Sequence, residues 1–443
     1  MLEQNFTSRQ VLGLIGVTLA GILASVACNI PLAIGFLPGL FMLIALVRTK
    51  RHSFSQILSV CKSGINRGKT VIFILFLVSF LLPSWYEAGT INQLVSLSLE
   101  VITPTHFLLL TFIISMFFSM ILGTSVGTLS SIGIPIITSA AAIHIALPTV
   151  AGALISGAFV GDRTSPFSSA HQLLSNIVEV PVKKQFRAIF VTTITAVMAG
   201  SLYYWILDLH IQNSSLVHEH SLFRGKSVSM VKFIPPAVLI TAVLLRFKII
   251  YAFMASIISA CIIALFAKVA PNALLHSLFS GVPGIGGGLQ NMYLLLIFLA
   301  LAGAYNGLLE EYKVIQPLLD RWMTKSGSLA LDTVKTIIAT LGISLIAGNQ
   351  TLPIILTGRS FLSHWSNKHS KEELARVMAD STMLFPAMIP WSVLALMCSS
   401  ILGVSLFDYL PFAIFLWILP ILTIIFSLGK KIKASSSVVS NTG

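Results

Sequence analysis

The sequence predicts an all-α polytopic membrane protein with about ten transmembrane helices, inverted repeats, broken helices and re-entrant hairpins. Hydrophobic residues make up 56% of the chain and charged residues only 10%, whereas soluble domains carry about 25% charged residues. Apolar runs long enough to cross a membrane recur along the whole chain. Short polar stretches interrupt these runs at matching places in the two halves: GTSVGT at 123–128, GDRTSPFSSAH at 161–171, AGNQTLP at 347–353 and ADSTMLFPAMIPWS at 379–392.

The net charge of +13 is explained by membrane orientation and needs no polyanionic partner. Lysines and arginines gather in short connections at 48–69, 183–187 and 430–433. Basic residues in short loops face the cytoplasm and set the orientation of a membrane protein. A nucleic-acid surface needs a basic patch clustered on one element, so we expect no nucleic acid partner. The four cysteines show no CxxC spacing and therefore indicate neither a metal site nor a disulfide.

The first half opens with a helical hairpin whose ends lie in the cytoplasm, because the connection 48–69 carries only basic charges. The loop 87–104 has Glu87 and Glu100 but no Lys or Arg, which places it outside. In order, the expected elements are helices at 11–27, 31–47 and 70–86, two apolar arms around GTSVGT (the first at 105–121), a segment broken at GDRTSP, a helix at 188–207 and a polar outer loop at 209–232.

The second half repeats the order of arm, break and broken segment after a linking region. The run of glycines in GVPGIGGG predicts an irregular outer loop, since glycine adopts backbone conformations that other residues rarely adopt. In the linking region we expect a tight hairpin at 233–266 turning at 246–248 and the loop 281–288. A helix at 290–309 and a surface segment at 310–328 follow. The repeat of the earlier order then consists of an apolar arm at 329–346, the GNQTLP break, an arm to Arg359, a charged cytoplasmic loop at 361–378, the ADST segment and a final helix ending in KKIK.

These elements divide the chain into five parts, in which two transport repeats enter their hairpins from opposite sides of the membrane. Because 105–121 is long enough to cross alone, a full crossing stays open beside the re-entrant hairpin. The parts are 1–69 (N-terminal hairpin and basic loop), 70–208 (first repeat), 209–289 (outer loop and linking hairpin), 290–429 (second, inverted repeat) and 430–443 (basic tail).

The polar breaks predict a transport site near the middle of the membrane. Irregular backbone at membrane depth is tolerated only where protein or a water-filled cavity satisfies its polar groups. Breaks at corresponding positions of two repeats mark the substrate site of secondary transporters. We therefore expect the breaks to meet at the interface of the repeats.

Asp162 and Asp380 are the acidic residues most embedded in apolar sequence, and each is followed by hydroxyl residues and a proline. Intramembrane carboxylates are costly and usually mark ion pathways or proton relays. Carboxylate, hydroxyl and carbonyl oxygens are also the ligands of hard cations. The alternative is that each aspartate is an N-cap at the edge of the membrane.

Other polar residues of the breaks are weaker candidates for binding a substrate or ion. Hydroxyls beside small residues also serve helix packing. His171 is either a proton carrier or a hydrogen-bonded helix residue, and Arg163 and Arg359 either neutralise a carboxylate, clamp an anion or snorkel to the interface. The candidates are Thr124, Ser125, Thr128, Thr164, Ser165, Ser168, Ser169, His171, Asn349, Gln350, Thr351, Ser381 and Thr382.

Four motifs occur in a characteristic order: GTSVGT, GALISGAFVGDRTSP, GISLIAGNQTLPIILTGRSF and ADSTMLFPAMIPWS. Over most of residues 70–425 the chain thereby resembles the NhaC-type sodium/proton antiporters of the ion-transporter superfamily. The resemblance implies alternating-access exchange of sodium, or a similar monovalent cation, for protons, without a cofactor. It implies a multi-pass protein of the bacterial inner membrane, in which Asp162 and Asp380 couple the fluxes and bind the cation, and it leaves a homodimer open.

The chain departs from this family pattern where the family tends to carry carboxylates. Ser169, Asn349 and Ala379 stand at those positions. A cation site with fewer carboxylates binds its ion less tightly, because the charge of the ligands helps to set affinity. Proton- or sodium-coupled exchange of a small organic acid or amino acid on the same fold therefore stays open.

Other classes of membrane protein fit less well. The GxGD motif of an intramembrane aspartyl protease fails because position 159 is Phe159, and neither HExxH nor GxSxG occurs, so we expect no enzyme. A channel builds its filter or pore from rings of groups, usually supplied by several subunits. A duplicated chain with broken helices favours a carrier instead.

Overall fold

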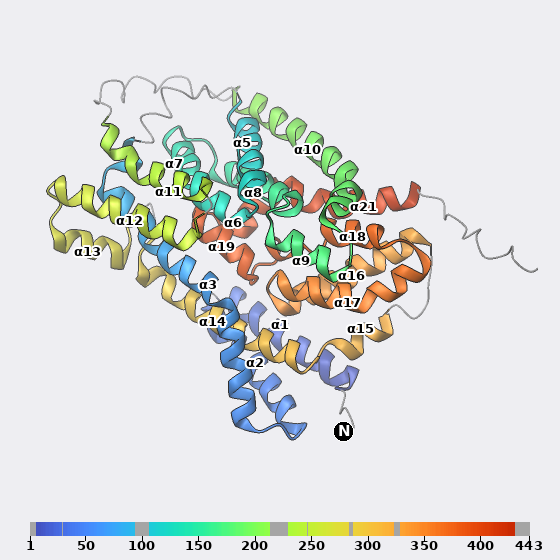
Figure 1. Ribbon diagram of the computed structural model, residues 1–443. Coiled ribbons are helices and arrows are strands. Elements are labelled where there is room, and N and C mark those ends of the chain that lie inside the picture. The colour runs from blue at the N-terminus through green and yellow to red at the C-terminus, as the bar shows by residue number, and fades with distance from the viewer. Residues whose placement is uncertain are drawn as a thin grey trace, which may run out of the picture.

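The computed structural model describes residues 6–28, 30–93, 106–212, 229–245, 247–282, 287–322 and 328–429. In these ranges helices are joined by tight turns and short breaks (Figure 1). Seven helices of the described residues are long and apolar enough to cross a membrane, or eight if the bent stretch Val393–Phe412 is one span. Shorter apolar helical stretches accompany them. The all-α polytopic membrane fold is confirmed.

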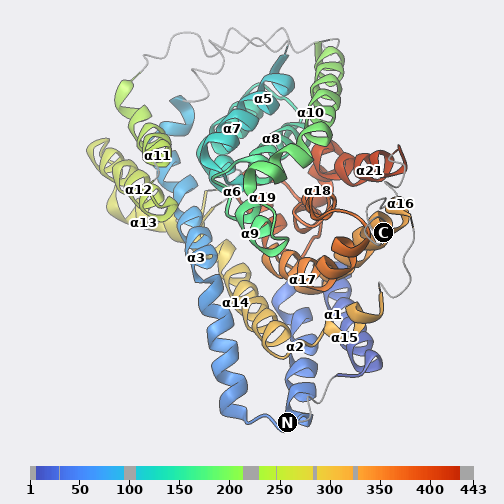
Figure 2. The ribbon, with the colours of Figure 1, turned by 45° about the vertical axis from the view of Figure 1, so that its right-hand side comes forward.

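Two long helices, α3 (Phe54–Glu87) and α14 (Leu289–Glu311), run side by side (Figure 2). Glycines allow this contact: a Cβ added to Gly64 would lie 2.3 Å from the carbonyl oxygen of Gly303. Small residues at helix contacts are how membrane helices approach closely. The opening hairpin of α1 (Ser8–Ala27) and α2 (Leu32–Thr49), at its expected place, packs on α14.

The expected basic loop at 48–69 is wrong, because most of it belongs to α3. Ser53 starts this helix with a capping box to Gln56, and the helix then runs for 34 residues. At 1.5 Å per residue its length is about 51 Å, well beyond the roughly 30 Å hydrocarbon core. The helix is therefore long enough for its N-terminal part, which carries the basic side chains, to extend beyond the lipid.

The linking region contains the expected hairpin, formed by α11 (Ile234–Leu244) and α12 (Ile249–Phe266). Arg246 of its turn lies outside the described residues, as does most of the outer loop 209–232. An unpredicted short helix, α13 (Pro271–Ser280), precedes the glycine-rich connection. In that connection Gly281, Gly287 and Gly288 have positive φ, as expected of an irregular loop.

The first half of the transport region is a series of broken helices. Helix α5 (Phe107–Leu122) ends at Gly123, whose φ of 68° is left-handed. The chain restarts as α6 (Ser125–Thr128), passes through a π-helical turn at Leu129–Gly133 and continues as α7 (Ile134–Ala142). A second break, at 165–168, separates α8 from α9. The remaining helices of this half are α8 (Leu147–Thr164), α9 (Ser169–Ile177) and α10 (Val182–Gln212).

The second half follows the same plan, with α16 (Leu329–Ala347) ending at Gly348, whose φ is 57°. The expected charged loop at 361–378 is wrong: α17 (Thr351–Lys368) and α18 (Lys371–Asp380) fill it, with Ser370 capping α18. An irregular stretch containing a 3-10 turn at Phe385–Ala387 follows α18. The other helices of this half are α15 (Gln316–Trp322), α19 (Val393–Leu402), α20 (Leu406–Tyr409) and α21 (Ile414–Gly429).

A column of hydroxyl residues repeats in the two halves at four-residue spacing. It ends in each half at the left-handed glycine, whose N–H bonds the carbonyl of the serine four residues earlier. Residues four apart share one face of a helix, so each column lines one side. The columns are Thr111, Ser115, Ser119 and Gly123 in α5, and Thr336, Thr340, Ser344 and Gly348 in α16. The five-part division of the chain stays a prediction, and this repeat supports its two transport units.

Candidate functional site

Both aspartates lie at the C-terminal ends of helices. Asp162 is in the last turn of α8, and Asp380 is the last residue of α18. The N-cap interpretation is therefore wrong for both. A negative charge is unfavourable at the negative end of the helix dipole, so other groups must stabilise these carboxylates when they are charged. Both side chains are buried, and their surroundings differ.

Asp162 faces polar groups from both halves. Its Oδ2 accepts a hydrogen bond from Nε2 of Gln350 at 3.3 Å, and the same amide donates to the carbonyl of Met383 at 2.8 Å. Ser125 and Ser168 lie beside the Asp162 carboxyl group. Among the described residues, no Lys, Arg or His forms an ion pair with it. Residues of the first break, the second break and the opposite half thus meet at Asp162.

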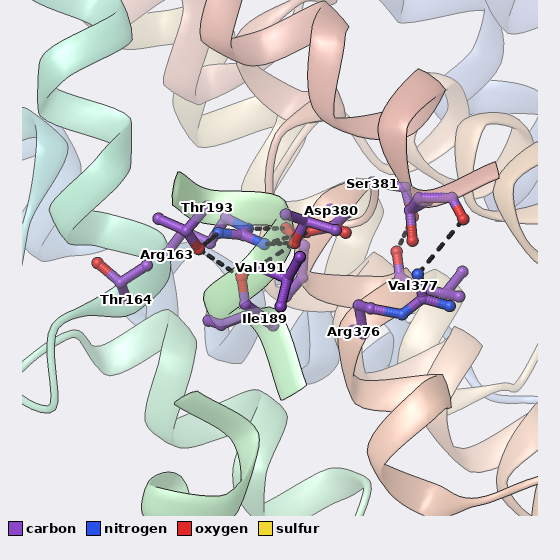
Figure 3. A network of polar contacts seen from close by, with 12 residues as sticks. Arg163, Thr164, Ile189, Val191, Thr193, Arg376, Val377, Asp380 and Ser381 are labelled. Carbon is purple, nitrogen blue, oxygen red and sulfur yellow. Dashed lines mark hydrogen bonds and ion pairs between the residues drawn. The ribbon is translucent and has the colours of Figure 1, made fainter. Parts of the chain in front are cut away.

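The next residue along α8, Arg163, forms a separate polar centre with Asp380 (Figure 3). Its guanidinium donates to Oδ1 of Asp380, to the Thr192 hydroxyl at 3.0 Å and to the Thr193 hydroxyl at 2.5 Å. Its Nε donates to the carbonyl oxygen of Ala379 at 3.2 Å. Both side chains of the ion pair have no exposed surface. Arg163 therefore neutralises a carboxylate, as one of the three interpretations anticipated.

A buried ion pair of this kind fixes the two halves against each other. Removing either partner would leave an uncompensated charge in a medium of low dielectric constant, which is strongly destabilising. A second buried arginine, Arg376, lies one turn before Asp380 and donates to the Ser427 hydroxyl at 2.9 Å. Asp380 is thus surrounded by compensating positive charge, whereas Asp162 is surrounded by neutral polar groups.

Most of the predicted hydroxyls in the first half bond to backbone groups. Thr124 caps α6 and Ser168 caps α9. Thr128 and Thr164 bond carbonyls one turn earlier in their own helices, at 2.8 and 2.6 Å. Ser165 donates to the Met120 carbonyl on α5 at 2.7 Å. These contacts hold the two breaks together, and they favour the packing interpretation for Thr128 and Thr164.

The predicted residues of the second half form a hydroxyl cluster and two local hydrogen bonds. Thr382 lies 3.3 Å from Thr340, whose hydroxyl is 3.2 Å from that of Thr357. Asn349, one residue before the N-cap of α17, accepts a bond from the Leu352 N–H of its first turn at 2.9 Å. Ser381 bonds the Val377 carbonyl in its own helix at 2.6 Å.

Two other predicted residues, His171 and Ser169, have no hydrogen bond to Asp162 or Asp380 among the described contacts. His171 is buried, and its Nδ1 is 3.0 Å from Nε2 of Gln185, so it is a hydrogen-bonded helix residue. Ser169 is exposed at the start of α9. The exposed position of Ser169 gives no sign of an enclosed cation ligand there.

The sequence patterns did not identify four threonines: Thr192 and Thr193, which accept hydrogen bonds from Arg163, and Thr340 and Thr357, which form the hydroxyl cluster with Thr382. Thr340 belongs to the four-residue column in α16, so comparison of the two columns would have identified it. Thr192 and Thr193 lie within an ordinary apolar helix and had no such signal. Their role depends on how α10 packs against α18.

The donor set at Asp162 is one that a monovalent cation can use. It offers carboxylate, hydroxyl and amide groups, whereas no cluster of three His, Cys, Asp or Glu side chains suited to a metal occurs among the described residues. The surrounding groups are neutral, so the carboxylate can be balanced by a proton or by a bound cation. That is the elementary requirement for exchanging one against the other.

Comparisons with known proteins agree with this chemistry. The chain is 29% identical to the Na(+)/H(+) antiporter NhaC of Bacillus subtilis, with 83% of this chain and 86% of the relative covered. It is 28% identical to NhaC of Alkalihalophilus pseudofirmus over the full length of both. A Malate-2H(+)/Na(+)-lactate antiporter of Bacillus subtilis is 26% identical over 91% of this chain and 90% of its own. The model of the Na+/H+ antiporter family matches residues 159–429, more than half of the chain, and the protein therefore belongs to that family.

Proposed function

We propose that this protein exchanges sodium, or a similar monovalent cation, for protons by alternating access in the inner membrane of a bacterium. The observation that carries the proposal is the neutral polar surrounding of the buried Asp162 carboxylate. A proton and a cation compete for this one charge, so only one of them occupies it at a time. Competition at a single carboxylate couples an inward flux of one to an outward flux of the other.

The contacts of Asp162 also suggest how the site changes access. Gln350 joins Asp162 of the first half to the break between α16 and α17 in the second half. Movement of one half relative to the other would alter this contact first, because the amide reaches Asp162 at 3.3 Å. The Arg163–Asp380 pair, buried deeper, then acts as the pivot that stays closed.

A second candidate is exchange of a small organic acid or amino acid coupled to protons or sodium. Asn349 and Ala379 favour it, since the resemblance leads us to expect carboxylates there. One similar protein bears the name of a malate/lactate antiporter. An organic anion is easier to accommodate where fixed negative charges have been removed.

The test is proton flux from the purified protein in liposomes that hold a pH-sensitive dye. Pulses of sodium, lithium and potassium come first, followed by small carboxylic and amino acids. A sodium- or lithium-driven proton flux supports the leading proposal. If none of the three cations drives a proton flux but an organic solute does, the second candidate replaces the first. A homodimer stays a prediction, which the mass of the solubilised protein tests.

A further inference from the structure

A cavity of about 240 Å³ lies between the α3–α14 pair and the break in the second half. Its walls come from α3, α14, Asn349 with the first residues of α17, and the start of α19. The glycines of the lining differ: Gly64, Gly303 and Gly307 pack α3 against α14, whereas Gly68 leaves space open. A Cβ added to Gly68 would meet no atom within 4 Å, so Gly68 faces the open interior.

The inner end of the cavity adjoins the Asp162 centre. Asn349 and Thr351 line the cavity, and Gln350 between them reaches Asp162 with its side chain. A backbone bond of 2.8 Å from the Val393 N–H to the Gly348 carbonyl holds this segment in place. The cavity is therefore separated from the candidate transport site by a single stretch of three residues.

Two residues of the lining, Arg67 and Glu310, form a partly exposed ion pair. Arg67 Nη1 lies 2.7 Å from Glu310 Oε2, and the two side chains are 48% and 35% exposed. Arg67 belongs to the basic N-terminal part of α3, which the positive-inside rule assigns to the cytoplasm. The cavity thus runs from the cytoplasmic side toward Asp162.

One polar atom in the wall lacks a partner. Asn306, on α14, lines the cavity, and its Oδ1 is covered and accepts no hydrogen bond from the described residues, so the amide must turn for this oxygen to face the cavity. A buried acceptor without a partner is unfavourable unless water or an ion satisfies it. Amide oxygens are ligands that suit hard cations. At about 30 Å³ per water, the cavity has room for an ion with part of its hydration shell.

We propose that this cavity is the cytoplasmic access path of the transport site and that Asn306 supplies an oxygen ligand to the cation within it. The proposal rests on the proposed function, because it takes the cargo to be sodium or lithium. The cation passes the Arg67–Glu310 pair, is held by Asn306 and then reaches Thr351 and the Gln350–Asp162 contact. Asn306 is a binding residue in this scheme and takes no part in the proton transfer.

Transport kinetics test the ligand role of Asn306. In everted vesicles, whose outer face is the cytoplasmic one, Asn306→Ala should raise the apparent KM for sodium about fivefold with little change in maximal rate, as loss of one hydrogen-bond-sized contact does. Asn306→Asp should lower the KM. An unchanged KM in Asn306→Ala, with active wild-type protein, would overturn the ligand role.

Two glycine variants test the path itself. Gly68→Val places a side chain in the open space of the cavity and should reduce sodium-driven flux severalfold, because the path is narrowed. Valine forms helix more readily than glycine, so α3 should be retained. Gly342→Val is the matched control: a Cβ there also meets no atom, but Gly342 lines a separate apolar cavity beside α1. Equal flux in the two variants would contradict the proposal.

The charges of Arg67 and Glu310 test whether the transported ion is a cation or an anion. Arg67→Gln leaves Glu310 uncompensated and should lower the KM for sodium, whereas Glu310→Gln leaves Arg67 uncompensated and should raise it. The opposite pattern would mean an anionic cargo and overturn the cation assignment.

Chemical labelling separates this inference from the proposed function. In a background with the four native cysteines replaced by alanine, Gly68→Cys should react with a membrane-impermeant cationic methanethiosulfonate from the cytoplasmic face, and Gly342→Cys should not. No reaction at position 68 would overturn the access path whatever the transport assay gives. Reaction there in a protein that moves no cation would leave the path standing and refute the proposed cargo.

Discussion

The two halves of the transport region contain the same hydroxyl column but use it differently. In the first half, Ser115 and Ser119 donate to the carbonyls of Leu154 and Ala158 on the neighbouring helix, the former at 2.7 Å. In the second half, the Thr340 hydroxyl faces other hydroxyls, and Ser344 Oγ is buried without a hydrogen-bond partner among the described residues. The first column is part of a packed contact, and the second leaves polar groups available.

Glycine explains the difference. Helix α8 carries Gly157 and Gly161 against α5, and a Cβ at Gly161 would lie 2.1 Å from the carbonyl carbon of Ser119. Small residues spaced by four let the helices approach until serine hydroxyls reach the opposing carbonyls. The matching helix of the second half, α18, is ten residues long and contains no glycine. The same pattern thus forms a close helix contact in one half and a buried cluster of hydroxyl groups in the other.

The two aspartates also differ, since Asp162 has neutral polar neighbours and Asp380 is paired with Arg163. We expect the largest effect on transport from neutralising Asp162. Asp162→Asn should reduce sodium-dependent proton flux in liposomes by at least about 100-fold, the scale on which loss of a proton-transferring group acts. Asp408→Asn is the control, since Asp408 is exposed on α20. Full pH-dependent exchange in Asp162→Asn would show that Asp162 does not couple the fluxes.

Breaking the buried ion pair should mainly cost stability. Arg163→Gln or Asp380→Asn leaves one uncompensated buried charge, for which a loss of about 3–5 kcal/mol in the free energy of unfolding is typical. The double variant Arg163→Gln/Asp380→Asn should recover part of that loss. Thermal unfolding of the solubilised protein measures all three, and a double variant with the summed losses of both singles would argue against direct coupling.

Restoring a carboxylate in the second half sharpens the comparison. Asn349→Asp keeps the bond to the first turn of α17, because aspartate accepts the Leu352 N–H as asparagine does. It adds a ligand charge and should lower the apparent KM for sodium by about tenfold. Asn367→Asp, at the exposed end of the same helix, makes the identical chemical change and should leave the KM as it is. Equal effects of the two variants would mean that general electrostatics causes them.

The smallest expected effect concerns the serines of the two columns. Ser119→Ala removes a bond to the Ala158 carbonyl and should lower the free energy of unfolding by about 1 kcal/mol. Ser344→Ala removes a hydroxyl without a partner among the described residues, so stability should be unchanged or slightly higher. The same thermal unfolding assay decides. A larger loss in Ser344→Ala would show that its hydroxyl has a partner that stabilises the fold.

Charged segments are helical where loops were predicted. The segments 48–69 and 361–378 were expected to be loops, yet α3, α17 and α18 occupy nearly all of them. Charge excludes a segment from lipid but does not prevent a helix, since lysine, arginine and glutamate are good helix formers. The positions of the polar breaks were predicted well, because glycine at 123 and 348 provides the left-handed conformation that ends each helix.

The sequence by itself determined the class of protein, the apolar helices and the places where they break. These follow from properties of each residue and its near neighbours: transfer into lipid and local backbone conformation. Only the tertiary structure decided which polar groups meet. Gln350 reaches Asp162 across 188 residues, and Arg163 reaches Asp380 across 217. Such pairs depend on how closely helices approach and how each is rotated, and it is the packing of glycines and hydroxyls between helices that sets both.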